Sequence, residues 1–181
     1  MLNHRFQIAV CGSAEVSDPD VAVMAETIGT ELAKTGSIIL TGATTGYPWH
    51  AAKAAKEAGG LSIGFSPAEN RDEHTGRYAK PTDAFDFFVF SGFGYEGRNT
   101  LLVRSADAVI FIGGRIGTVN EFTAAYQSNK LIGLLTNSGG TIDLLPKLAQ
   151  KSNKAGGMII QEPDPVKLTI AIISKLTVEG S

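Results

Sequence analysis

The stretch DAVIFIGGRIGTVNEFTAAY (Asp107–Tyr126) contains the pattern of a strand, a glycine-rich turn and a helix. Ala108–Ile112 is an unbroken apolar run, which is typical of a strand covered on both faces. Gly113 and Gly114 end this run, and apolar side chains then recur at helical spacing from Val119. We expect the free backbone N–H groups at such a helix start to favour an anion, most often phosphate.

Two interpretations fit Glu121. The tetrapeptide Thr118-Val119-Asn120-Glu121 has the spacing of a capping box, with Thr118 as the N-cap and Glu121 at position N3. A cap of this kind contributes about 1 kcal/mol to helix stability. In the second interpretation, the Glu121 carboxylate points into a cleft and takes part in chemistry. The spacing alone leaves both interpretations open.

Length and composition predict one domain spanning residues 1–181. Of these residues, 43% are hydrophobic and 19% are charged, which is ordinary for a globular protein. The net charge of −2 argues against duplex nucleic acid as a partner. No apolar run approaches the length of a membrane span, and the first ten residues lack a signal-peptide pattern. We therefore expect a cytoplasmic protein that binds neither nucleic acid nor a membrane.

Strand and helix patterns alternate along the chain. The expected strands are Phe6–Cys11, Ser37–Leu40, Leu61–Phe65, Phe85–Phe90, Ala108–Ile112, Lys130–Leu135 and, at an edge, Gly157–Gln161. The expected helices cover about residues 19–34, 48–58, 98–105, 118–126, 141–150 and 163–176. This alternation predicts a Rossmann-like, doubly wound α/β fold, with a mainly parallel sheet of about seven strands and helices on both faces. Residues 66–84 lack periodicity and are expected to form a loop or lid.

Glycine-rich turns follow the first, second, fourth and fifth expected strands. Because the carboxyl ends of parallel strands lie along one edge of a doubly wound sheet, we expect these turns to converge on one crevice. In the fourth-strand turn, Gly92, Gly94 and Gly97 also spell the dinucleotide fingerprint GxGxxG. That match keeps an NAD-dependent oxidoreductase open as a weaker alternative, since the fingerprint normally follows the first strand.

Several other residues have two possible roles. Cys11, the single cysteine, ends an apolar strand and is expected to be a small buried thiol rather than a nucleophile. Tyr47, Trp49 and Tyr95 flank the glycine turns, where they could stack on a base or simply pack. A core position is expected for Phe87, Phe88 and Phe90. No metal site is predicted, because the three histidines are scattered: His4, His50 and His74.

Three stretches of the chain resemble the LOG-like family, whose members were once labelled "possible lysine decarboxylase". They are TGATTG (residues 41–46), GYEGRN (94–99) and RSADAVIFIGGRIGTVNEF (104–122), and the resemblance covers about residues 6–135. Some members of that family cleave the N-glycosidic bond of nucleoside 5′-monophosphates, releasing the base and ribose 5-phosphate. Others, such as molybdenum-cofactor carrier proteins, bind a nucleotide-like ligand without that activity.

The resemblance implies roles for particular residues. Arg98 and Glu121 match the motif arginine and glutamate of the family and are the candidate catalytic residues. The glycine turns and the resemblance together give these candidate phosphate- or nucleotide-binding residues: Gly12, Ser13, Gly42, Gly92, Gly94, Asn99, Gly113, Gly114, Arg115, Gly117 and Thr118. Family members commonly form homodimers or larger homo-oligomers, so the same is expected here.

The chain departs from the hydrolase pattern around Arg98. Where the phosphoribohydrolases read His-Glu-Arg-Lys, this chain reads Glu96-Gly97-Arg98-Asn99, and Ile112 replaces the proline that usually precedes the double glycine. Two functions therefore remain: a nucleoside 5′-monophosphate N-glycosidase, or a nucleotide or molybdopterin-type carrier without turnover. In the first, Glu121 would stabilise positive charge on the ribose or orient a water, and Arg98 would clamp the phosphate.

Hydrolysis of an N-glycosidic bond needs no cofactor, and none is expected. Lysine decarboxylation is rejected, because no lysine lies in a context that suggests a Schiff base with pyridoxal phosphate.

Overall fold

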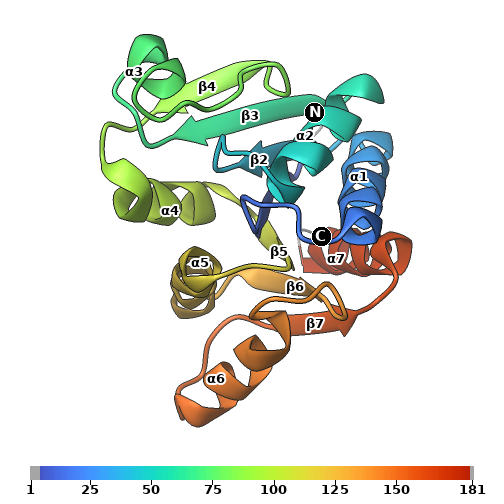
Figure 1. Ribbon diagram of the computed structural model, residues 1–181. Helices are drawn as coiled ribbons and strands as arrows, with labels where there is room; N and C mark the ends of the chain where they lie inside the picture. The colour runs from blue at the N-terminus through green and yellow to red at the C-terminus, as the bar shows by residue number, and fades with distance from the viewer. Residues whose placement is uncertain (1–4, 180–181) are drawn as a thin grey trace.

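Seven strands form one parallel sheet in the computed structural model, which describes residues 5–179 (Figure 1). In chain order the strands are β1 (Gln7–Gly12), β2 (Ile38–Thr41), β3 (Leu61–Ser66), β4 (Phe87–Phe90), β5 (Ala108–Ile112), β6 (Leu131–Leu135) and β7 (Ile159–Glu162). Their order in the sheet is β4-β3-β2-β1-β5-β6-β7, and every neighbouring pair is parallel. The predicted Rossmann-like doubly wound fold is confirmed, and β7 lies at an edge as expected.

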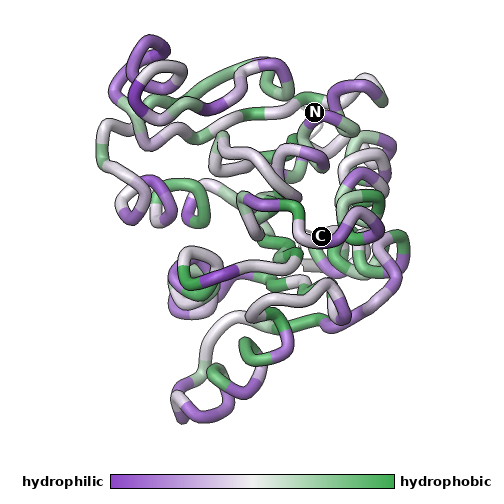
Figure 2. The backbone as a smooth tube through the Cα atoms, in the orientation of Figure 1, coloured by the Kyte–Doolittle hydropathy of each residue, from purple (hydrophilic) through white to green (hydrophobic). Residues whose placement is uncertain are grey.

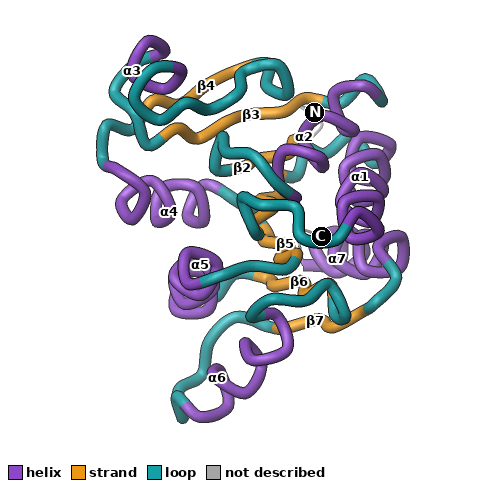
Figure 3. The backbone as a smooth tube through the Cα atoms, viewed as in Figure 1, coloured by secondary structure: helices purple, strands orange, loops and turns teal. Residues whose placement is uncertain are grey.

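Helices cover both faces of this sheet (Figure 3). They are α1 (Pro19–Lys34), α2 (Tyr47–Glu57), α3 (Arg71–Thr75), α4 (Gly94–Ser105), α5 (Ile116–Gln127), α6 (Leu145–Lys151) and α7 (Pro165–Glu179), with a 3₁₀ turn, η1 (Ile142–Leu144), before α6. One apolar layer joins the sheet to α1, α2 and α7, and a second joins it to α4, α5 and α6. No helix among residues 5–179 is long and apolar enough to cross a membrane.

Alternation along β1 shows how the sheet divides the core. Ile8 and Val10 point into the layer under α1, α2 and α7, whereas Ala9 and Cys11 point into the layer under α4 and α5. Every residue of β5 is buried, as its continuous apolar run predicts. Figure 2 shows the same arrangement, with hydrophobic residues along the central strands and hydrophilic residues concentrated on the outer helices and loops.

Helix α1 begins and ends where the sequence signals place its ends. Asp18 is the N-cap, and its Oδ1 accepts a hydrogen bond of 2.9 Å from the amide of Asp20. Pro19 occupies the first position of the helix, where its missing N–H costs nothing. Gly36 follows the helix with φ at +74°, the left-handed conformation that favours glycine.

The capping-box interpretation of Glu121 is wrong. Helix α5 begins at Ile116 with Arg115 as its N-cap, so Thr118 lies in the first turn rather than before it. Ile116, the first residue of the helix, is 83% exposed. Its position therefore gives no pattern of apolar burial from which the start of the helix could be predicted. Glu121 consequently lies in the second turn of α5, on its buried face.

Helix α4 also begins earlier than expected, at Gly94. Gly97 and Arg98 therefore lie inside the helix rather than in a turn before it. Gly97 has a packing role there, because a Cβ on it would meet the Cβ of Phe93 at 2.6 Å. The GxGxxG match therefore spans the loop after edge strand β4 and the first turn of α4.

Two expectations about residues 66–90 are corrected. The segment predicted as an irregular loop contains α3, whose His74 is buried and hydrogen-bonded to Ser66 Oγ (2.9 Å) and Pro81 O (3.2 Å). Phe87 is 61% exposed instead of buried, because β4 is an edge strand with incomplete cover. Phe88 and Phe90 are only partly buried.

Candidate ligand-binding site

A cavity of about 220 Å³ lies at the carboxyl end of β1, where the strand order reverses between its neighbours β2 and β5. This is the position at which doubly wound sheets usually bind ligands. The structure brings nine of the predicted site residues into its lining: Gly12, Ser13, Gly42, Arg98, Asn99, Arg115, Gly117, Thr118 and Glu121. These residues come from the end of β1 and the loop after it, the β2–α2 loop, α4, the β5–α5 turn and the first two turns of α5.

Four predicted binding glycines lie outside the lining. The amide of Gly113 donates a 2.8 Å hydrogen bond to Ser138 Oγ, and Gly114 O accepts one of 3.1 Å from the amide of Thr141. These two glycines therefore shape the β5–α5 turn from behind the cavity. Gly92 and Gly94 lie after edge strand β4, away from the point where the strand order reverses.

Arg98 reaches the cavity from α4 and is only 4% exposed. Its Nη1 donates to the carbonyl oxygens of Gly42 and Phe65, the latter at 3.0 Å. Its buried Nε has no hydrogen-bond partner among the described residues. Burial lowers the pKa of Arg98, and the nearby Glu121 carboxylate opposes that shift. The guanidinium is therefore held firmly on one side and left with a donor unused.

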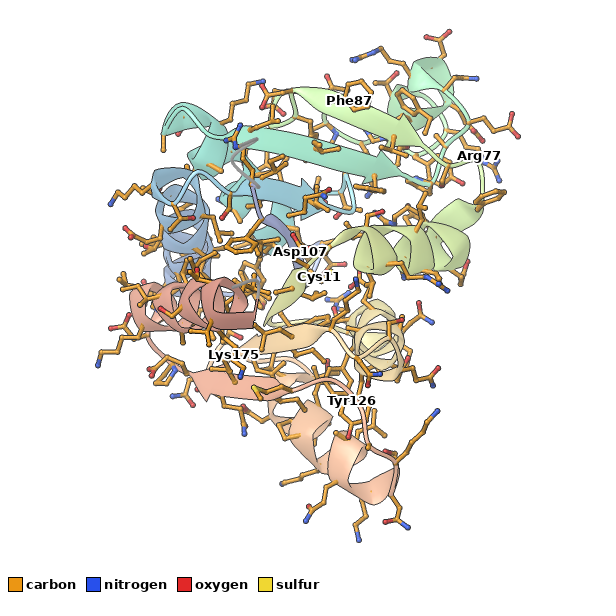
Figure 4. All side chains as sticks on the ribbon, turned by 180° about the vertical axis from the view of Figure 1, so that it is seen from behind. Cys11, Arg77, Phe87, Asp107, Tyr126 and Lys175 are labelled. Carbon is orange, nitrogen blue, oxygen red and sulfur yellow. The ribbon has the colours of Figure 1, made fainter. Side chains whose placement is uncertain are left out.

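Glu121 faces the same cavity from α5 and is 8% exposed. Burial raises the pKa of its carboxyl group to about 7, while the positive charge of Arg98 and a hydrogen bond with the Cys11 thiol act in the opposite direction. Burial and the Glu121 carboxylate both raise the pKa of Cys11, so this thiol stays protonated near neutral pH. Cys11 is a buried free thiol near the centre of the molecule (Figure 4). We call Cys11, Arg98 and Glu121 the floor of the cavity.

The start of α5 forms one wall. Gly117 has open space around it, because an added Cβ would meet no atom within 4 Å. Thr118 is 3% exposed and also faces the cavity. Since the first N–H groups of a helix have no partner within the helix, this wall offers donors and a partial positive charge.

An ion pair lies at the mouth of the cavity. Arg115, after β5, donates two hydrogen bonds of 2.8 and 2.6 Å to the carboxylate of Glu15, after β1. Both side chains line the cavity but are mostly exposed, at 68% and 66%. Exposed pairs of this kind contribute at most about 1 kcal/mol to stability, so the mouth can open at little cost.

A model of the SLOG cluster4 family matches residues 5–169. The chain belongs to the SLOG cluster4 family. An uncharacterised protein of Archaeoglobus fulgidus is 30% identical to this SLOG cluster4 protein over 129 residues, which are 71% of this chain and 79% of that protein. The resemblance to LOG-like proteins that the sequence suggested is thereby confirmed.

Solved structures similar to this SLOG cluster4 protein include two of molybdenum-cofactor proteins. The molybdenum cofactor binding protein of Rippkaea orientalis has a TM-score of 0.79 and 29% identity, and the molybdenum cofactor carrier protein of Chlamydomonas reinhardtii has 0.78 and 27%. Each comparison covers 97% of this chain and 99% of the other. DNA processing protein A of Helicobacter pylori, at 20% identity and a TM-score of 0.66, shares only the fold.

The three aromatic residues near the glycine turns have different positions in this SLOG cluster4 protein. Tyr95 lines the cavity and is 42% exposed, with Arg98 Cζ 5.8 Å from its ring centre. Tyr47 is buried, and its hydroxyl accepts hydrogen bonds from the amides of Ser17 (3.3 Å) and Asp18 (3.1 Å). Tyr47 thus supports the loop after β1 and cannot stack on a ligand. Trp49 lies outside the cavity and donates to Asp83 at 3.1 Å.

The sequence interpretation missed the turn after β6, TNSGGT (Thr136–Thr141). Ser138 in this turn accepts the amide of Gly113 and donates to Leu135 O at 2.5 Å. Gly140 packs so closely on Gly114 that a Cβ would overlap its backbone. The signal was available, because Asn, Ser and two glycines directly follow an apolar strand.

Residues 5–179 of this SLOG cluster4 protein contain no group of three histidine, cysteine or acidic side chains that could hold a metal ion. Of the three histidines considered above, His4 lies outside the described residues.

Proposed function

We propose that this SLOG cluster4 protein is a binding and carrier module for a phosphorylated ligand of the nucleotide or molybdenum-cofactor kind. The proposal rests mainly on Arg98. A buried guanidinium is costly unless its donors find acceptors, yet its Nε has none among the described residues. A ligand in the cavity that supplies an acceptor to the Arg98 guanidinium would reduce that cost.

The start of α5 supports the phosphate part of the proposal. Helix N-termini favour anions because unpaired N–H groups and the helix dipole act together. Gly117 leaves room for close approach to the backbone, and the Ser13 hydroxyl and the Arg115 guanidinium lie in the same lining. Arg115 would exchange its carboxylate partner Glu15 for the phosphate of the ligand.

The comparisons support the carrier part. The two molybdenum-cofactor proteins resemble this chain along nearly its whole length. Gly97 and Asn99 replace residues of the phosphoribohydrolase pattern, and Gly97 is fixed in α4 by its contact with Phe93. These observations favour binding without turnover.

Glu121 gives a specific reason to keep hydrolysis as a second candidate function. A carboxylate in the cavity with a pKa of about 7 is suited to acid–base work at neutral pH. Cleavage of an N-glycosidic bond leaves positive charge on the ribose, which ionised Glu121 would stabilise while a water attacks. No cofactor is required for that reaction.

Calorimetry and chromatography test these functions together. The purified protein is titrated with AMP, GMP and the molybdenum cofactor, and each mixture is then analysed for free base and ribose 5-phosphate. The carrier proposal predicts saturable binding without release of base. Release of base that disappears in Glu121→Gln would establish the hydrolase instead, and absence of binding by every ligand would contradict both functions.

The family resemblance also leads us to propose a cytoplasmic homodimer or larger homo-oligomer. Light scattering during size-exclusion chromatography gives the mass directly, and a mass of 19.0 kDa, that of one chain, would contradict the oligomer. Fractionation of the native cells tests the location.

A further inference from the structure

The floor of the cavity presents two opposite and unmatched polar groups. Arg98 offers a buried donor without an acceptor, and Glu121 offers a carboxylate whose one described hydrogen bond is with the Cys11 thiol. Each charge acts on the pKa of the other group, yet no ion pair joins them in the described part of the chain. A carboxylate has about four acceptor positions, so most of those of Glu121 are free.

We propose that this floor recognises a 2-amino-4-oxopyrimidine edge, the group that guanine and pterins share. The inference rests on the proposed function and deepens it by naming the ring. On this edge a ring N–H and an amino group lie side by side, matching the two oxygens of Glu121. The carbonyl oxygen beside them matches the guanidinium of Arg98, which lines the same cavity. Arginine pairing with the guanine carbonyl, and carboxylates accepting from base amino groups, are established modes of base recognition.

Other ligand groups satisfy the floor less well. Adenine has an amino group but no carbonyl oxygen, and its neighbouring ring nitrogen is an acceptor that would face the Glu121 carboxylate. A phosphate at the floor would lie beside Glu121 and be repelled by it. The phosphate is better placed at the start of α5, where Gly117 and Thr118 offer donors. The ring therefore lies at the floor and the charged end towards α5 and Arg115.

The size of the cavity fits this orientation. Its volume of about 220 Å³ is below the roughly 300–1,000 Å³ of pockets that enclose a whole drug-sized ligand. It would enclose the ring and leave the remainder of the ligand at the mouth, beside Glu15 and Arg115.

The orientation also fixes the sign of the pH dependence. Glu121 accepts two donors only as a carboxylate, and its pKa in the free protein is about 7. Cys11, which faces it from β1, stays neutral, and Arg98, which faces it from α4, stays charged. Affinity for the ring should therefore rise between pH 6 and pH 8. A ligand anion placed against Glu121 would give the opposite trend.

Calorimetric titration with GMP, AMP and XMP tests the inference, because these nucleotides share the ribose phosphate and differ in the ring edge. We expect GMP to bind at least about tenfold more tightly than AMP or XMP, a ratio typical of one good polar pair. In Glu121→Gln the amide donates to the 2-oxo group of XMP, so the preference between GMP and XMP should shift by at least about tenfold towards XMP. Glu57→Gln, which changes an exposed carboxylate on α2, serves as the control and should leave all affinities unchanged.

Each outcome decides between the proposals. Equal affinity of the wild-type protein for GMP, AMP and XMP would overturn the recognition of the ring edge while leaving the binding function intact. 6-Hydroxymethylpterin phosphate is titrated in parallel, and failure to bind either it or GMP would overturn the recognition of the ring edge. Only if AMP, XMP and the molybdenum cofactor also fail to bind would the binding function be overturned. Tighter binding of one of these two probes assigns the edge to a guanine nucleotide or to a pterin. If Glu121→Gln does not fold, the comparison among the three nucleotides in the wild-type protein decides alone.

Discussion

Gly42 lies so close to Arg98 that a Cβ at position 42 would overlap the guanidinium. The carbonyl oxygen of Gly42 is also an acceptor for Arg98 Nη1, so the β2–α2 loop both makes room for the arginine and holds it. The φ angle of Gly42 is not in the left-handed region, so the backbone does not require glycine at this position. The close approach of the Arg98 guanidinium does.

Gly42→Ala should displace Arg98 from the floor of the cavity. Overpacking of this kind costs about 1–3 kcal/mol of stability, and we expect GMP affinity to fall by at least about tenfold. Urea unfolding and calorimetry measure the two effects. Wild-type affinity in a folded Gly42→Ala protein would show that the position of Arg98 does not matter for the ligand.

Gly117→Ala should separate stability from binding. The helical position has open space, so alanine should stabilise the protein by about 0.5–1 kcal/mol through its higher helix propensity. The added methyl group should nevertheless weaken binding of a phosphorylated ligand, because it blocks close approach to the backbone. A thermal melt without ligand and a titration with GMP check both parts; unchanged affinity would place the phosphate elsewhere.

Glu15→Gln should free Arg115 without harming the fold. The exposed pair that it breaks is worth at most about 1 kcal/mol, so the urea midpoint should hardly move. Affinity for an anionic ligand should rise, most clearly at low salt, because a competing carboxylate is gone. Titrations of the wild type and of Glu15→Gln at two salt concentrations measure this. If the variant binds the anion no more tightly than the wild type at low salt, Arg115 does not contact the anion.

Tyr47→Phe should destabilise the loop after β1. The buried hydroxyl accepts part-buried hydrogen bonds from the amides of Ser17 and Asp18, and each such bond contributes about 0.5–1.5 kcal/mol. Tyr126→Phe is the matched control. The Tyr126 hydroxyl bonds Lys154 O at an exposed position, where water replaces it, so we expect a smaller loss in urea unfolding. Equal losses in the two variants would contradict the supporting role of Tyr47.

Glu121 should make the stability of the ligand-free protein fall between about pH 4.5 and pH 7. Its carboxyl pKa is raised from 4.5 to about 7, so in this interval the folded state binds more protons than the unfolded state. The free energy of unfolding therefore decreases with rising pH, with an upper limit of about 1.4 kcal/mol per pH unit. Urea titrations across this interval should show a shallower decrease in Glu121→Gln than in Glu57→Gln. Equal slopes in the two variants would mean that Glu121 titrates normally.

The sequence predicts the fold better than it predicts the site. The apolar run Ala108–Ile112 gives β5 with its observed bounds, because burial on both faces requires every residue to be apolar. The start of α5 was misplaced, since exposed Ile116 gives no signal of burial in the first turn. The role of Ser138 depends on a contact between the turns after β5 and β6, and chain order does not specify which turns touch.

The placement of Arg98 and Glu121 in one cavity was suggested by family resemblance and not by spacing. The residues lie on different helices, and their distance depends on how α4 and α5 pack. Their burial, which leaves the Arg98 donor unused and raises the pKa of Glu121, could be known only from the folded arrangement.

Calorimetric titration of the wild-type protein and Arg98→Ala with GMP tests most directly whether the buried guanidinium holds a ligand. The account predicts saturable binding by the wild-type protein and at least about a tenfold loss in the variant, with circular dichroism confirming that the variant is folded. Equal affinity of the two folded proteins, or no binding by the wild type, would contradict it.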